Sequence, residues 1–368
     1  SFERNKYGIN GGYSVRGTVY NNGVEINNGN FDGVDISGGY SEYGSISKNH
    51  VIINDGTFNN YMDVYGGNSK NIGIVSDNYV IINNIGENYF GGIYGGFSAS
   101  GIVARNNVTV KDDIYAFDVV GGYGDHDAEA AVYGNSVNVN NSDSTIYTVA
   151  GGKNYNGNVF LNSVSLADSN ISGTVYGGMT MQGNAYNNNV NIKSSYVTGN
   201  VSGGYLQDTH GAGEVKNNTV IINKSDITGS VIGGYADSKA SVSDNIVEII
   251  DSNVQGNIVG GYSAGGSADN NTVVLKGSDS EMYNLEQASV TGGYSGSNIS
   301  SNNRLVLDSW QGNLKNISGT DEIVFGKINW QDDGTVIKIT GQQVTDLSGT
   351  SINGNWISFD TEDPKQHI

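Results

Sequence analysis

Residues 218–262 read NTVIINKSDITGSVIGGYADSKASVSDNIVEIIDSNVQGNIVGGY, and two successive copies of one repeat make up this stretch. Each copy begins with Asn-x-φ-x-φ, where φ is a branched aliphatic residue, and ends with φ-x-Gly-Gly. Apolar and polar residues alternate within the first pattern, as in Val190-Asn191-Ile192 of an earlier copy. A period of two predicts an extended strand with one buried face. The stretch therefore predicts short strands that recur once per copy.

The two patterns alternate eleven times along the chain, and the Asn is never replaced. It occupies positions 22, 49, 78, 106, 135, 162, 188, 218, 245, 271 and 303. Successive Gly-Gly pairs lie 26 to 32 residues apart, which is the period range of stacked repeats. We therefore expect an all-β, single-chain parallel β-helix of about eleven coils of about 28 residues.

Each repeated residue type has an expected place in such a coil. Val and Ile columns would fill the interior, because β-branched side chains pack well on pleated strands. The Asn column would lie where a coil turns into a strand, since Asn tolerates the left-handed conformation and stacked amides bond one another. Gly-Gly would form a second corner that needs positive φ or close backbone approach. A third aliphatic column is expected at Ile171, Val197, Ile227 and Val254.

The repeat pattern ends at Leu307, which predicts two regions. Residues 1–309 are expected to form the helix, and residues 310–368 to form capping strands and a tail. The second region holds Trp310, Trp330 and Trp356, all three tryptophans of the chain. Bulky aromatic residues on strands outside the repeat suit a cap over the last coil.

Composition narrows the classes of partner. The chain has 18 Lys and Arg against 37 Asp and Glu, for a net charge of −19. Such a surface repels phosphates, so nucleic acid is not an expected partner. There is no cysteine, which removes disulfides and thiol chemistry. No apolar stretch is long enough to span a bilayer, and we expect any export signal to lie outside the given sequence.

The longest loops carry the residues best suited to chemistry. Asp125, His126 and Asp127 lie in one loop, and Asp208 and His210 in another. Three coils separate the loops, about 14 Å along the rod, so their carboxylates are too far apart to act as a catalytic pair. Residues 121–125, Gly-Gly-Tyr-Gly-Asp, partly match the calcium-binding repeat Gly-Gly-x-Gly-x-Asp, but the tandem copies that a calcium cage needs are missing. We predict no catalytic residues, no metal and no cofactor.

An aromatic column follows the Gly-Gly pairs. The residue after the pair is aromatic in eight coils: Tyr13, Tyr40, Phe97, Tyr123, Tyr205, Tyr235, Tyr262 and Tyr294. Tyrosine supplies amphipathic contact area at low entropic cost, so the column is either a recognition stripe or a stacked ladder that shields the coil. As candidate binding residues we take four of these tyrosines and the two loops: Tyr123, Asp125, His126, Asp127, Tyr205, Asp208, His210, Tyr235 and Tyr262.

The repeat style resembles the passenger region of type V autotransporters. The units that carry this resemblance are Gly261-Tyr262-Ser263 and Asn271-Thr272-Val273, with a stretch from Asn316 to Ser348 that is similar to the junction before the translocator. The resemblance implies a right-handed β-helix at the bacterial cell surface, secreted across the outer membrane and linked to a membrane β-barrel outside the given sequence. It further implies a virulence-associated, non-catalytic adhesin, in a style like that of fusobacteria, whose partner is a host cell-surface glycoprotein or glycan receptor or other bacterial cells.

Three alternatives stay open at this point. Parallel β-helices also include polysaccharide lyases and glycoside hydrolases. The 13- to 14-residue half-spacing also resembles the left-handed, half-length coils of trimeric autotransporter heads. Finally, the rod flank could self-associate. Irregular insertions and the lack of C-terminal heptads favour a monomer over a trimer.

Overall fold

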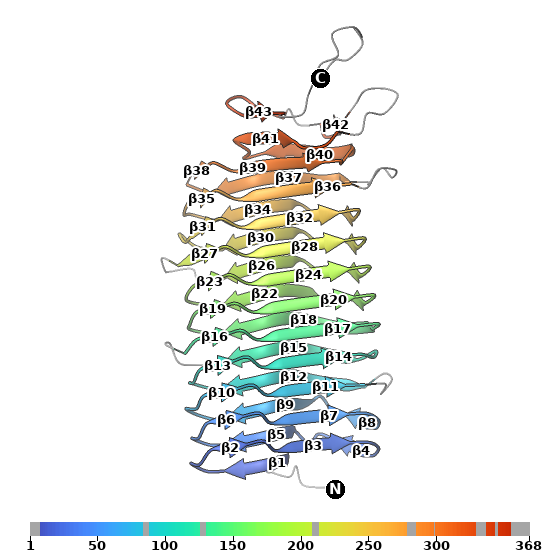
Figure 1. Cartoon of the computed structure of the whole chain (residues 1–368), viewed down its shortest axis with the longest axis vertical. Helices are drawn as coiled ribbons and strands as arrows, with labels where there is room; N and C mark the ends of the chain where they lie inside the picture. Colours follow the sequence, from blue (N-terminus) through green and yellow to red (C-terminus); the bar gives the residue numbers. More distant parts are fainter. Residues whose placement is uncertain are drawn as a thin grey trace.

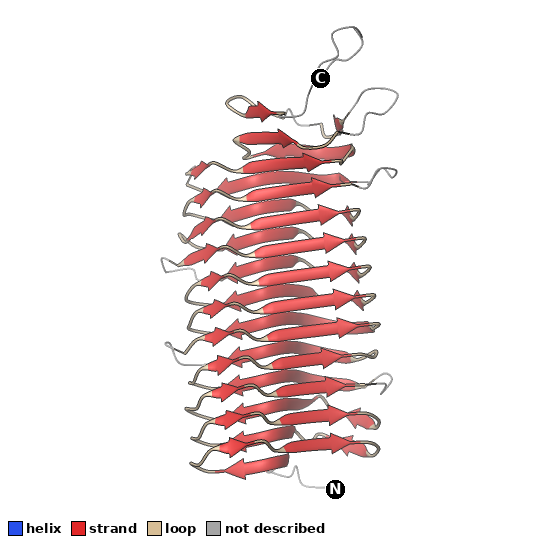
Figure 2. Cartoon of the chain, viewed as in Figure 1, coloured by secondary structure: helices blue, strands red, loops and turns tan. Residues whose placement is uncertain are grey.

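The computed structural model describes residues 8–83, 88–125, 130–207, 213–277, 285–297, 299–328, 336–342 and 345–354. In these residues every regular element is a strand, and the strands stack into a rod with the chain termini towards opposite ends (Figures 1 and 2). The described part contains no helix with the length and apolarity needed to cross a bilayer.

The fold is a parallel β-solenoid of about 12 turns of about 27 residues. Each strand pairs in parallel with its equivalent one full repeat later, so Val108, Val137 and Val164 lie in register in successive coils. Likewise Ile9 pairs with Ile36. The β-helix prediction is confirmed, and pairing over a full repeat is incompatible with the half-length coil.

The eleven strands that carry the Asn-x-φ-x-φ pattern, together with β41 and β43, form a 13-stranded sheet in the described part, here called the Asn sheet. Its strands are β3 (Gly23–Ile26), β7 (His50–Ile53), β11 (Tyr79–Ile82), β14 (Asn107–Val110), β17 (Ser136–Asn140), β20 (Ser163–Ala167), β24 (Asn189–Lys193), β28 (Thr219–Asn223), β32 (Ile246–Ile250), β36 (Thr272–Lys276), β39 (Arg304–Asp308), β41 (Glu322–Phe325) and β43 (Ser351–Asn353).

The strands that carry Gly-Gly form the second long sheet, here called the Gly-Gly sheet. Its main strands are β1 (Ile9–Ser14), β5 (Ile36–Ser41), β9 (Met62–Ser69), β12 (Tyr89–Ser98), β15 (Tyr115–Gly124), β18 (Asp143–Asn154), β22 (Thr174–Thr180), β26 (Val201–Leu206), β30 (Val231–Ala236), β34 (Ile258–Ser263), β37 (Leu285–Ser295), β40 (Gly312–Ser318) and β42 (Ile337–Ile339). Four short corner strands join it: β21 (Asn170–Ile171), β25 (Tyr196–Val197), β29 (Asp226–Ile227) and β33 (Asn253–Val254).

A third, narrow sheet connects each Gly-Gly strand to the next Asn strand. It contains β2 (Val19–Tyr20), β6 (Ile46–Ser47), β10 (Val75–Ser76), β13 (Val103–Ala104), β16 (Val132–Tyr133), β19 (Val159–Phe160), β23 (Ala185–Tyr186), β27 (Glu214–Lys216), β31 (Ser241–Ser243), β35 (Ala268–Asp269) and β38 (Ser300–Ser301). A two-stranded pair, β4 (Asn30–Asp32) and β8 (Thr57–Asn59), closes the opposite corner in the first coils.

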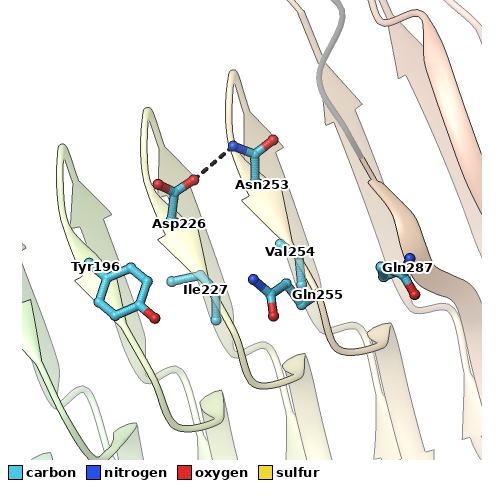
Figure 3. A pocket seen from close by; sticks show the side chains of 7 residues that line it. All are labelled: Tyr196, Asp226, Ile227, Asn253, Val254, Gln255 and Gln287. Atoms are coloured by element: carbon cyan, nitrogen blue, oxygen red, sulfur yellow. Dashed lines mark hydrogen bonds between the residues drawn. The ribbon is translucent and has the colours of Figure 1, made fainter.

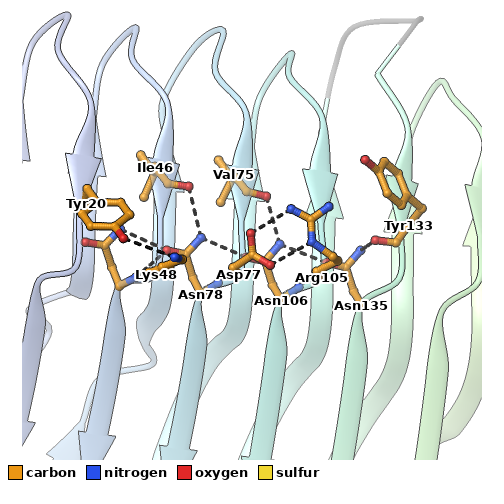
Figure 4. Close-up of polar contacts among 11 residues, drawn as sticks. Tyr20, Ile46, Lys48, Val75, Asp77, Asn78, Arg105, Asn106, Tyr133 and Asn135 are labelled. Atoms are coloured by element: carbon orange, nitrogen blue, oxygen red, sulfur yellow. Dashed lines mark hydrogen bonds and ion pairs between the residues drawn. The ribbon is translucent and has the colours of Figure 1, made fainter.

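The repeated Asn residues form a buried ladder, as predicted. In each coil the Asn Nδ2 and its backbone N–H both donate to Oδ1 of the next Asn, for example Asn106 to Asn135 at 3.0 and 2.9 Å. Nδ2 also donates to a carbonyl of the narrow sheet, as Asn106 does to Val75 (Figure 4). The ladder ends where the Asn303 N–H donates to Asp321. Because each amide is paired, the ladder fixes the register without leaving buried polar groups unsatisfied.

The left-handed residue is not the ladder Asn but the residue before it. Lys48, Asp77 and Arg105 have φ of 57°, 58° and 55°. No ladder Asn has positive φ, and the Asn side chains reach the neighbouring coil from inside. Arg105 and Asp77 additionally form an ion pair of 2.8 Å on the surface (Figure 4). The prediction of a left-handed position was thus one residue out of place.

The Gly-Gly pairs lie inside strands rather than at a corner, and no described pair has positive φ. Glycine is needed at these positions because other atoms of the chain lie too close to leave room for a Cβ. A Cβ on Gly152 would lie 2.5 Å from Cγ of Asn162, and one on Gly151 would lie 2.6 Å from the carbonyl oxygen of Gly177. The second glycine therefore packs against the Asn ladder, and the first packs against the next coil.

The coil continues after the sequence pattern ends. β40 pairs with β37, and β41 with β39, both in parallel. Trp310 is buried in the core, whereas Trp330 and Trp356 lie outside the described residues. The pairing of β40 and β41 accounts for the turn beyond the eleven that the pattern predicts.

Candidate binding surface

The outer face of the Gly-Gly sheet carries two columns of side chains. One column lies just before the Gly-Gly pair and the other, the aromatic column, lies just after it. The two columns contact each other: Tyr94, Val120 and Ala150 of the first form a small cluster against which Tyr123 packs. Tyr94 is only 9 % exposed although it is on the outside of the coil. The two columns therefore pack against each other across the glycines that separate them.

The aromatic column is a stacked ladder in coils eight to eleven. Tyr205, Tyr235, Tyr262 and Tyr294 have successive ring centroids 5.1, 4.8 and 4.9 Å apart and are nearly parallel. Three predicted binding residues, Tyr205, Tyr235 and Tyr262, are thus brought together. Their ring faces are covered by each other, and only ring edges and hydroxyls reach solvent.

The hydroxyls of Tyr205 and Tyr235 have raised pKa values. Burial, and then the charge of Asp237, raises the pKa of Tyr205 to about 12. Burial also raises the pKa of Tyr235, whose hydroxyl donates to Asp237 at 2.6 Å. Tyr205 and Tyr235 therefore keep their protons at neutral pH and contribute mainly to packing between coils.

Tyr123 lies apart from this ladder, because Lys153 and Met179 occupy the two intervening positions. Its hydroxyl donates to Asp125 at 3.0 Å, and burial raises its pKa. The Lys153 ammonium lies 5.3 Å from the ring centroid and forms an ion pair of 3.0 Å with Asp118. This tyrosine is therefore already engaged with charged side chains of its own chain.

The four remaining predicted residues, His126, Asp127, Asp208 and His210, lie outside the described residues. Gly124 of the partial calcium match faces the interior, where a Cβ would meet Asn154 and Val132. In the described segments there is no group of three or more His, Asp or Glu side chains that could hold a metal ion.

A second aromatic surface, absent from the expectations above, lies on the same sheet in coils three to six. We call it the five-ring patch; it consists of Tyr61, Tyr89, Tyr115, Phe117 and Tyr147. Ring centroids are 5.2 to 6.3 Å apart, and five of the seven contacts between them are tilted or edge-on by more than 40°. Unlike a parallel stack, this arrangement leaves ring faces open.

Four of the five side chains of the patch are about half exposed. Tyr61 and Tyr147 are each 51 % exposed, Phe117 is 46 % and Tyr89 is 43 %. The Tyr115 hydroxyl donates to that of Tyr147 at 3.0 Å, and this bond raises the pKa of Tyr115 to about 12. Contiguous exposed apolar patches are typical of interaction sites, so the five-ring patch is a candidate binding surface.

The sequence did contain a signal for this patch. Tyr61, Tyr89 and Tyr115 are 28 and 26 residues apart, and Phe117 and Tyr147 are 30 apart, so each series follows the repeat period. The residues precede the Gly-Gly pairs by four to six positions, outside both repeated patterns.

A hollow of about 400 Å³ lies at the corner formed by β25, β29 and β33 (Figure 3). Tyr196, Ile227 and Gln255 line it, and across its edge Asn253 donates to Asp226 at 2.8 Å. Its lining is mainly amide and aliphatic. Tyr196 is its one aromatic side chain, whereas the patch has five, so the patch is the stronger candidate for binding.

No protein-family model matches this chain, and no curated protein or solved structure matches it either. The class of the protein therefore follows from its fold alone: it is a parallel β-solenoid, and its described surface includes an open aromatic patch and a closed aromatic ladder.

Proposed function

We propose that this chain is the passenger of a type V autotransporter and acts as a non-catalytic adhesin on a bacterial surface. The observation that carries the proposal is the five-ring patch, held open on a rigid scaffold. Stacked coils and the Asn ladder fix the spacing of the rings, so little conformational entropy is lost when a partner binds. Tyrosine and Phe are typical of binding hot spots.

The charge of the chain narrows the partner. With a net charge of −19, and with Asp63 two residues after Tyr61 of the patch, the surface disfavours anionic glycans and phosphates. We propose a host cell-surface glycoprotein, bound through an uncharged or basic part of its surface. Cohesion with neighbouring bacterial cells would use the same patch.

Beads coated with the chain provide the test, because the receptor need not be known in advance. A triple variant, Tyr89→Ser, Phe117→Ser and Tyr147→Ser, is expected to lower bead attachment to epithelial cells about tenfold or more. The matched control changes Tyr20, Tyr43 and Tyr155 to Ser, all exposed and outside the patch. Equal attachment of both triple variants would disprove binding through the patch.

A glycan panel in the same experiment separates adhesion from catalysis. An adhesin leaves the panel chemically unchanged, whereas new reducing ends or unsaturated sugars would replace the proposal with a hydrolase or a lyase. Preference for sialylated over neutral glycans would contradict the charge argument.

A further inference from the structure

One eight-residue motif occurs twice on the Gly-Gly sheet. Residues 35–42 read DISGGYSE and residues 118–125 read DVVGGYGD, so each has Asp, then Tyr five positions later, then a carboxylate two positions after the Tyr. Asp35 and Tyr40 belong to the second coil, and Asp118 and Tyr123 to the fifth. The parallel register runs from Tyr40 through Asn68 and Phe97 to Tyr123, with one shift in β12 between Phe90 and Ile93, so the two tyrosines occupy equivalent positions on the sheet.

In the fifth coil this arrangement holds an ammonium group. Lys153, in register with Tyr123 one coil later, places Nζ 3.0 Å from the carboxylate of Asp118 and 5.3 Å from the ring centroid of Tyr123. The side chains of Lys153 and Asp118 are 23 % and 21 % exposed. A partly desolvated ammonium between a carboxylate and an aromatic face is a favourable combination.

In the second coil the lysine is missing. The residue in register with Tyr40 is Asn68, which is too short to reach Asp35. A hollow of about 420 Å³ is found there instead, lined by Tyr13, Asp35, Ser37, Tyr40, Glu42 and Asn68. Tyr13 stacks on Tyr40 with centroids 5.7 Å apart and extends the aromatic wall. The volume is within the range of small-molecule sites.

We propose that this hollow is a binding site for a primary alkylammonium group, which takes the place that Lys153 occupies in the fifth coil. Asp35 pairs with the charge, the Tyr40 ring contacts it, and the small Ser37 leaves room for the alkyl stem. Lys70 also lines the hollow. It follows Ser69, which pairs with Ser41, so Lys70 lies beside Glu42, at the end of the hollow away from Asp35. In the described residues Lys70 forms no ion pair with Asp35.

The chemistry fits two sources, a lysine side chain and an amino sugar. Nα-acetyl-lysinamide and glucosamine serve as probes for these sources, and N-acetylglucosamine, which is uncharged, serves as the control ligand. Binding is followed by NMR titration of the backbone amides of Tyr40 and Asn68. The site is independent of the five-ring patch, so the result does not depend on the proposed adhesin function.

The comparison of the second and fifth coils suggests the variants, which exchange the residue types found at positions 68 and 153. Asn68→Lys gives the second coil its own ammonium and should weaken probe binding about tenfold or more, because a tethered group competes at high effective concentration. Asn191→Lys, an exposed position on β24, makes the same change in charge elsewhere and should leave binding unchanged. Lys153→Asn should open a second site at Tyr123.

The expected result is that at least one amine shifts Tyr40 and Asn68 in the wild-type chain, and the amine that does so identifies the source. The proposal is overturned if neither amine shifts them, if N-acetylglucosamine binds as tightly, or if Asn68→Lys binds like Asn191→Lys. An unchanged urea midpoint for Asn68→Lys shows that loss of binding is not loss of fold. If Lys153→Asn fails to fold, the Asn68→Lys comparison alone decides.

Discussion

The Asn ladder inside the coil and the aromatic column outside it are both repeated once per turn, yet only the ladder is invariant. All eleven repeats keep the Asn, whereas the aromatic position is replaced by Asn68, Lys153 and Met179 in three of eleven. The ladder is buried, so each amide depends on the amide one coil away. On the outer face, water or a neighbouring side chain can supply the hydrogen bonds that a substituted residue needs. Strict repetition therefore marks structure here, and departures from it mark places where function can differ between coils.

The largest effect should come from interrupting the ladder. Asn162→Ala removes the acceptor of the Asn135 N–H and Nδ2 groups and the donor to the Val132 carbonyl. Each buried group left unpaired costs roughly 1–3 kcal/mol, so we expect a loss of about 4 kcal/mol in the free energy of unfolding, measured by urea denaturation.

Asn191→Ala is the matched control, since Asn191 is exposed on the outer face of β24. It should change the unfolding free energy by less than about 0.5 kcal/mol. Equal losses for the two variants would mean that a ladder Asn contributes no more to the free energy of unfolding than an exposed Asn. The contrast between the buried ladder and the outer surface would then be wrong.

An intermediate effect should distinguish the two aromatic surfaces. Tyr235 has parallel neighbours on both ring faces, and each such pair contributes about 0.5–1.5 kcal/mol. Tyr235→Ala should therefore lower the unfolding free energy by about 2 kcal/mol and leave bead attachment unchanged. Tyr147→Ala, in the five-ring patch, should show the opposite balance: Tyr147 has a parallel neighbour on one face only, so we expect a smaller stability loss of about 1 kcal/mol together with weaker attachment.

If Tyr235→Ala abolishes attachment while Tyr147→Ala does not, the assignment of structure to the ladder and binding to the patch is wrong. Denaturation and attachment measured on the same two preparations give this answer directly.

The difference between these surfaces also shows what sequence can predict. Val137 and Asn135 were placed correctly because a buried residue repeats when its neighbour one coil away is its own equivalent. The Gly-Gly pairs were wrongly predicted to form a corner, because the repeat indicates close backbone approach at Gly152 but not that Asn162, inside the coil, is what approaches it. Likewise, a left-handed residue was expected at the turn, but its position before the Asn depends on where the side chain must point.

For the candidate site, register alone brings Tyr205, Tyr235 and Tyr262 together, and this much was predictable. Whether their ring faces are open was not, because that depends on side-chain rotation. The five-ring patch was missed for a related reason. Phe117 and Tyr147 lie in β15 and β18, strands of the Gly-Gly sheet that extend further towards their N-terminal ends than most of their equivalents, and such local extensions leave no mark in the shared pattern.

The smallest effect is a dependence on alkaline pH that belongs to the ladder. The pKa of Tyr205 is raised to about 12 in the folded chain, above the ordinary value near 10 of an unfolded tyrosine. The folded state therefore holds this proton more tightly, and the resulting stability is fully present below pH 10 and is lost as pH rises through about 12. The urea midpoint should fall across that window, and Tyr205→Phe should make the fall smaller, since it has no proton to lose. Tyr20→Phe, outside the ladder, is the matched control and should leave the fall unchanged; if both variants behave alike, the stacked ladder has no titration of its own.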